Sequence, residues 1–182
     1  MLLIYIYMKL KKMSNKNISL CLFGVYLFIL VWTVLFKGQI SLDHIGRYHN
    51  INLIPFAGSI RVNGKIDFLE IFANVFVFIP LGLFLSEEKK LSISIHILII
   101  ILVSTTMEIL QYILWIGVTD ITDIIGNTIG GVLGIVLHIF IVNKAKEKAH
   151  NIINILSAIF VASVFLIIVL LQTGILETRY FW

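Results

Sequence analysis

Acidic and amide side chains stand inside otherwise apolar stretches of this chain, in pairs three or four residues apart. Residues at that spacing share one face of a helix. Carboxylates on such faces can line a binding pocket, hold a divalent cation, or act as general acid and base. The pairs are Glu70 with Asn74, Glu108 with Gln111, and Asp123 with Asn127.

A structural role is the alternative for these residues. Asn and Gln side chains also join helices inside a membrane, and this interpretation fits Asn74, Gln111 and Asn127 as well as a binding site does. The carboxylates favour a functional site, because a charged group at membrane depth is costly and usually faces a protein interior or a water-filled cavity. Asp67 and Asp120 lie at the ends of apolar stretches, where headgroup water explains them, and Asp120 can also cap a helix.

Membrane helices must position these side chains. The chain has 182 residues, of which 59% are hydrophobic and 13% charged, and this composition excludes an ordinary soluble domain. About 20 apolar residues cross roughly 30 Å of hydrocarbon. The sequence therefore predicts an all-α, polytopic membrane protein with one domain over residues 1–182 and about five transmembrane helices. They are expected at about 17–36, 66–85, 92–116, 121–142 and 152–171.

Lysine and arginine predict the orientation, because short cytoplasmic loops carry the excess of these residues. With the N-terminus inside, nine lysines fall in cytoplasmic segments, within 9–16, 89–90 and 144–148, against five basic residues outside. This favours an N-in, C-out protein. Residues 37–65 then form an external loop, whose apolar run from Ile51 to Phe56 is expected to dip into the membrane interface.

The external loop completes the candidate site at the outer end of the bundle. Arg47 can pair with the carboxylates or bind an anion. Carboxylates and amides from three helices should reach a similar depth, so we expect one outer polar pocket. Its expected ligand-binding residues are Arg47, Asn52, Glu70, Asn74, Glu108, Gln111, Asp123 and Asn127.

Glycines at four-residue spacing, Gly126, Gly130 and Gly134, occupy the span expected at 121–142. Small residues at this spacing let another helix approach closely, so this span should pack against 66–85 or 92–116. The single cysteine, Cys21, excludes an intrachain disulfide. We expect no metal and no cofactor. The basic clusters indicate contacts with membrane lipid and not with nucleic acid.

The order and spacing of these residues resemble the VanZ-like family, small bacterial membrane proteins named for a teicoplanin-resistance protein. The resemblance covers roughly residues 20–142. It rests on Arg47 with Asn-Leu-Ile-Pro-Phe at 52–56, on Asn74 with Phe-Ile-Pro-Leu-Gly at 78–82, on Glu108 with Gln111, and on Asp120, Asp123, Asn127, Gly130, Gly131 and Gly134. Family members often carry a basic residue upstream of the aspartates, whereas 115–119 contain none. The resemblance implies a role at the cell envelope and, for some members, reduced susceptibility to glycopeptide antibiotics.

Three functions remain compatible with these residues. The first is a binding module whose outer pocket holds an amphiphilic envelope ligand: a cell-wall precursor, a lipid or a lipoglycopeptide. The second is a membrane-embedded enzyme, in which Glu108 and Asp123 act on a lipid-linked or diphosphate substrate as acid and base or hold a divalent cation. The third is a small-solute transporter, against which the apolar inner halves of the spans argue. All three place the chain in the bacterial cell membrane as a multi-pass protein.

Overall fold

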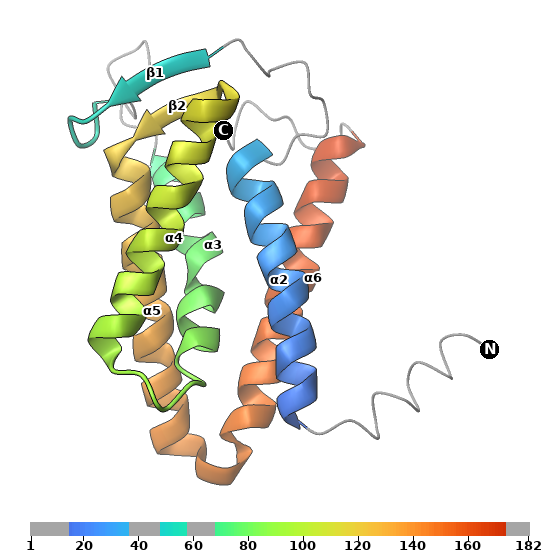
Figure 1. Ribbon diagram of the computed structural model, residues 1–182. Helices are drawn as coiled ribbons and strands as arrows, with labels where there is room; N and C mark the ends of the chain where they lie inside the picture. Colours follow the sequence, from blue (N-terminus) through green and yellow to red (C-terminus); the bar gives the residue numbers. More distant parts are fainter. Residues whose placement is uncertain (1–14, 37–47, 58–67, 174–182) are drawn as a thin grey trace.

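The structure is a computed structural model that describes residues 15–36, 48–57 and 68–173. The described part is a bundle of long helices with a two-stranded sheet across one end (Figure 1). The strands are β1 (Tyr48–Asn52) and β2 (Ile116–Asp120). The helices are α2 (Asn15–Phe36), α3 (Phe68–Leu85), α4 (Ile93–Leu114), α5 (Ile121–Ala145) and α6 (Ala149–Gln172), with the 3-10 turn η1 (Lys146–Lys148) between the last two.

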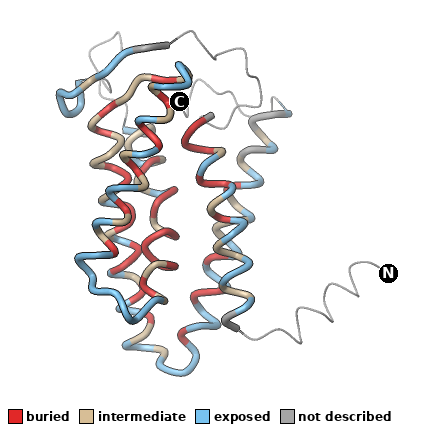
Figure 2. Tube along the Cα trace, viewed as in Figure 1, coloured by how far each residue is buried: buried red, intermediate tan, exposed pale blue. Residues whose placement is uncertain are grey.

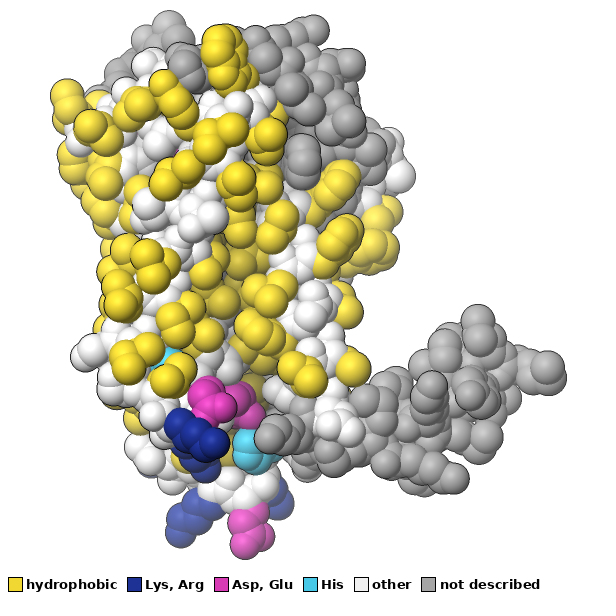
Figure 3. Space-filling view, in the orientation of Figure 1, with side chains coloured by type: hydrophobic (Ala, Val, Ile, Leu, Met, Phe, Trp, Pro, Cys, Tyr) yellow, Lys and Arg dark blue, Asp and Glu magenta, His cyan; other side chains and the backbone are white. Residues whose placement is uncertain are grey.

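Each span expected from the sequence coincides with one of these helices. By length and hydropathy, three stretches are suited to crossing a membrane: Asn17–Leu35, Ile93–Leu114 and Ile121–Ile167. The third stretch runs through both α5 and α6, between which the chain reverses direction (Figure 1), and Glu70–Leu85 is a shorter apolar helix. Apolar side chains also cover much of the outer surface between the two ends (Figure 3), as in proteins that face lipid.

The all-α prediction describes the helices correctly and misses the sheet. β1 and β2 pair in parallel, with Asn52 opposite Asp120. Helix α4 ends at Leu114, because Trp115 adopts a left-handed backbone conformation with φ 55°. The Trp115 backbone N–H donates to the carbonyl oxygens of Gln111 and Tyr112 in the last turn. The chain then continues directly as β2, so the last residue of the span expected at 92–116 belongs to a strand.

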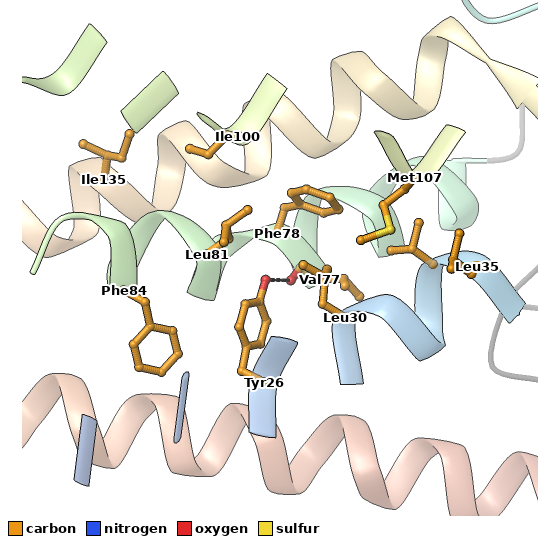
Figure 4. Close-up of a cluster of buried hydrophobic side chains, with 11 residues drawn as sticks. Tyr26, Leu30, Leu35, Val77, Phe78, Leu81, Phe84, Ile100, Met107 and Ile135 are labelled. Carbon is orange, nitrogen blue, oxygen red and sulfur yellow. Dashed lines mark hydrogen bonds between the residues drawn. The ribbon is translucent and has the colours of Figure 1, made fainter. Parts of the chain in front are cut away.

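The core of the bundle forms around α3 (Figure 4). Tyr26 and Leu30 of α2 pack against Phe78 and its neighbours on α3, and the Tyr26 hydroxyl donates a hydrogen bond to the Val77 carbonyl oxygen at 2.9 Å. Figure 2 shows the buried positions concentrated on α3 and on the sides of the other helices that face it. This apolar core fixes the helices that carry the polar residues.

Helices α3 and α5 cross so closely that no side chain fits between their backbones at the crossing. A Cβ atom at Gly130 would overlap the Val75 carbonyl oxygen, and a Cβ atom at Gly134 would overlap that of Ile79. The prediction that these glycines let another helix approach closely is therefore confirmed, and of the two expected partners, 66–85 and 92–116, the contacts of Gly130 and Gly134 show the first. The close crossing also brings the polar residues of α3 and α5 opposite one another nearer the sheet.

Candidate functional site

The sheet brings β1, which lies between α2 and α3 in the sequence, next to the start of α5. β2 ends at Asp120, the residue before α5, and this residue pairs with Asn52 at the end of β1. The described lysines lie at the other end of the bundle, near the start of α2 and in the α3–α4 and α5–α6 turns (Figure 1). The two ends of the described structure therefore differ in charge.

Asp120 connects three elements through hydrogen bonds. Its Oδ1 accepts from the Thr122 backbone N–H at 2.7 Å and so caps α5. Its Oδ2 accepts from Asn52 Nδ2 at 2.9 Å, and its own backbone N–H donates to Glu108 Oε2 at 2.9 Å. The predicted helix cap is confirmed. The predicted exposure to headgroup water is wrong, because the contacts with β1 and α4 leave Asp120 only 8% exposed.

Glu108 lies beneath β2 and is 1% exposed. Its carboxylate accepts the Asp120 backbone N–H, while its backbone carbonyl accepts the Thr119 hydroxyl at 3.0 Å. A buried carboxylate is stable only when polar hydrogens compensate for the water it has lost. The backbone of β2 supplies one of these hydrogens, so the strand is part of the site and not merely a connection.

Asn74 and Asp123 join α3 to α5 beside this network. Asn74 Nδ2 donates to Asp123 Oδ1 at 2.6 Å. Asp123 is partly buried and lies in the first turn of α5, where the helix dipole favours a negative charge. Next to it, Thr122 Oγ1 accepts the Phe56 backbone N–H at 2.9 Å, which fixes the turn after β1.

Gln111 and Asn127 bind other helices instead of this network. Gln111 Nε2 donates to the Val34 carbonyl oxygen of α2 at 2.8 Å, and Asn127 Nδ2 donates to Ser104 Oγ of α4 at 2.9 Å. Both amides are almost fully buried. For these two residues, the contacts fit the structural interpretation, in which amide side chains hold helices together.

The structure thus brings together part of the predicted set. Asn52 and Glu108 meet through Asp120, and Asn74 meets Asp123 directly. Glu70 is partly buried in the first turn of α3, one turn before Asn74. The predicted position of Arg47 in the site lies outside the described residues.

Sequence reasoning left Asp120, Thr119, Thr122 and Ser104 out of the candidate site. An Asp directly before an apolar helix, with a Thr two residues later, is a helix-start signal, and this signal could have drawn Asp120 into the site. Thr119 and Ser104 carry no comparable signal. Their importance comes from partners on other elements, which the sequence does not reveal.

Comparison with known proteins identifies a family that covers the region of the site. Residues 23–143 match the VanZ/LLP1 family, a stretch that contains both strands and every described residue of the site. The chain is 39% identical to Protein VanZ of Enterococcus faecium over 127 residues, which cover 68% of this chain and 75% of that protein. No solved structure matches the chain significantly. The chain therefore belongs to the VanZ/LLP1 family.

Proposed function

We propose that this chain is a multi-pass protein of the bacterial cell membrane that binds an amphiphilic envelope ligand at the sheet end of its bundle. The ligand is a cell-wall precursor, a lipid or a lipoglycopeptide, and binding reduces susceptibility to glycopeptide antibiotics such as teicoplanin. All five helices cross the membrane. The N-terminus and the lysine-bearing turns face the cytoplasm, in keeping with the preference of lysine for cytoplasmic loops, and the sheet faces outward.

The observation that carries this proposal is a carboxylate network next to exposed apolar side chains. Leu53 and Ile54 are 72% and 69% exposed and directly follow Asn52, which holds Asp120. Phe56, whose backbone is bonded to Thr122, is also exposed. An amphiphile needs both kinds of surface, because polar groups orient its head while apolar side chains accommodate its chains.

An enzyme that acts on a lipid-linked or diphosphate substrate is the second candidate. Glu108 of α4 contacts the backbone of Asp120, which lies at the junction of β2 and α5. Asp123 follows three residues later in α5, so the three carboxylates belong to the same end of the bundle. Carboxylates in different surroundings can act as an acid and base pair. Incubation of the purified protein with a lipid-linked precursor distinguishes the candidates: a released product favours catalysis, and an intact substrate favours binding alone.

Antibiotic susceptibility in a deletion strain tests the proposal. We expect the wild-type gene to restore low susceptibility to a lipidated glycopeptide more than to a non-lipidated one. Asp123→Asn should fail to restore it at equal protein abundance, because the change keeps the volume and removes the charge. Glu88→Gln, an exposed change at the other end, should behave as wild type. Full restoration by Asp123→Asn would contradict a functional role for this carboxylate.

A further inference from the structure

A second cluster of titratable side chains lies at the end of the bundle opposite the sheet. Glu87 follows α3, His138 lies on α5, and His150 lies in the first turn of α6. Glu87 Oε1 is 3.2 Å from His138 Nε2, and Glu87 Oε2 is 2.7 Å from His150 Nδ1. One carboxylate therefore bridges two helices from the α3–α4 turn. Figure 3 shows acidic, histidine and lysine side chains gathered at this end, below the apolar surface.

The bridging carboxylate is mostly shielded from water. The side chains of Glu87 and His138 are 18% and 9% exposed, whereas that of His150 is 52% exposed. Burial acts to raise the pKa of the Glu87 carboxyl, but the hydrogen bond with His138 and the charge of His150 outweigh burial and lower this pKa. The Glu87 carboxylate therefore stabilises the folded state above its unfolded pKa, and on the acid side this contribution is lost as the pH falls through the lowered folded value.

Imidazoles are the side chains that ordinarily change charge between about pH 5 and 8. His96 on α4 is buried, and its ring nitrogens accept or donate no hydrogen bond within the described residues. The other described charged groups near this end are Glu88, Lys89, Lys90, Lys144, Lys146, Glu147 and Lys148.

The cluster sits where α6 joins the rest of the bundle. Helix α6 lies beyond the stretch that matches the family, and it follows η1, whose first residue, Lys146, has a left-handed φ of 48°. Beside the cluster, Ala149 and Ile153 of α6 pack with Leu83 and Ile141. Further along, α6 packs against α2. A change in the contacts at the start of α6 can therefore alter how firmly the whole helix docks.

We propose that Glu87, His138 and His150 form a proton-sensing latch that fastens α6 to the α3–α4 turn. When the imidazoles gain protons, their contacts with the ionised Glu87 carboxylate become ion pairs, which adds an attraction between opposite charges to the hydrogen bonds. The latch closes as the pH falls and the imidazoles gain protons. Because α6 packs on α2, and α2 holds Gln111 through the Val34 carbonyl, the latch is linked to the sheet end.

Pulsed electron paramagnetic resonance on the full chain in lipid nanodiscs tests this latch. Spin labels on Lys89→Cys and Asn151→Cys, in a Cys21→Ser background, report the distance between the α3–α4 turn and α6. We expect a narrow distance distribution at pH 5.5 and a broader one at pH 8.5, with about a three- to five-fold change in the docking equilibrium, the size of a partly exposed ion pair. Identical distributions at both pH values would overturn the proposal.

Substitutions within the cluster separate the latch from a general effect of pH. Glu87→Gln should give the broad distribution at both pH values, because the bridging charge is lost. His150→Lys should give the narrow distribution at both, because lysine stays charged, and the half-exposed site tolerates the change. Glu88→Gln, an exposed neighbour, should respond as wild type. A wild-type pH response in Glu87→Gln or in His150→Lys would rule out the latch.

Discussion

Asp120 caps α5 with one carboxylate oxygen and holds Asn52 of β1 with the other. Its backbone N–H also donates a hydrogen bond to the buried carboxylate of Glu108. Removing the side chain loses the cap and leaves the Asn52 amide without its acceptor, while the backbone contact to Glu108 can persist. The loss of stability should therefore exceed that of a simple helix cap.

We expect Asp120→Ala to lower the stability by about 2 kcal/mol, the sum of a lost cap and an unsatisfied amide. Ser92→Ala is the matched control, because Ser92 caps α4 with a single 3.4 Å bond to the Ile95 backbone N–H on an exposed turn. It should cost about 0.5 kcal/mol. Thermal unfolding of both variants in the same detergent measures the difference, and equal losses would mean that the Asn52 contact contributes nothing.

The sequence identified the carboxylates of this site but not their connections. Glu108 and Asp123 were recognisable because charged groups are costly within apolar stretches. The contact of Asp120 with Asn52 was not, because it depends on a strand pairing that joins residues 68 positions apart. Gln111 and Asn127 are ambiguous in any single sequence, since an amide can bind a ligand or another helix, and only their partners on α2 and α4 distinguish the two.

At the scale of elements, the crossing of α3 and α5 places Asn74 against Asp123. The crossing is close because Gly130 and Gly134 leave room for the α3 backbone. The small-residue spacing predicted a close helix crossing at these glycines but left open whether α3 or α4 is the partner, whereas the helices themselves could be predicted from their length and apolar character. The end of α4 could not, because a left-handed Trp115 and a distant partner strand determine it.

Replacement of Gly130 by alanine tests this crossing. The added methyl group would overlap the Val75 carbonyl oxygen, which belongs to the backbone and cannot turn away. Gly24→Ala is the control, because a Cβ there meets nothing within 4 Å and alanine favours a helix by about 1 kcal/mol. We expect Gly130→Ala to lower the unfolding temperature in detergent and Gly24→Ala to keep or raise it. Similar behaviour of the two variants would show that α3 can move away without cost.

At the scale of the whole molecule, the described lysines and the carboxylate network occupy opposite ends of an apolar bundle. In the proposed orientation, which rests on the preference of lysine for the cytoplasmic side, the sheet end faces outward, where envelope precursors and glycopeptides are accessible. The latch of Glu87, His138 and His150 would lie on the inner side in this arrangement. The orientation is a prediction from the sequence, whereas the histidine cluster emerged only when the α3–α4 turn, α5 and α6 were placed together.

Single cysteines in a Cys21→Ser background test this orientation in intact cells. Asn50→Cys, at an exposed position of β1, should react with a membrane-impermeant thiol reagent. Lys89→Cys and Glu147→Cys, both exposed at the other end, should react only after the cells are opened. The reverse labelling pattern would place the sheet in the cytoplasm.

The most direct measurement is the affinity of the purified full chain, in lipid nanodiscs, for a lipidated glycopeptide. We expect wild type and Glu88→Gln to bind equally and Asp123→Asn to bind about tenfold more weakly or worse, because a hydrogen bond to a charged group contributes about 1.5–3 kcal/mol. Thermal unfolding shows whether Asp123→Asn is still folded. Equal affinity of folded Asp123→Asn and wild type, or no binding by the wild type, would contradict a ligand site at the sheet end.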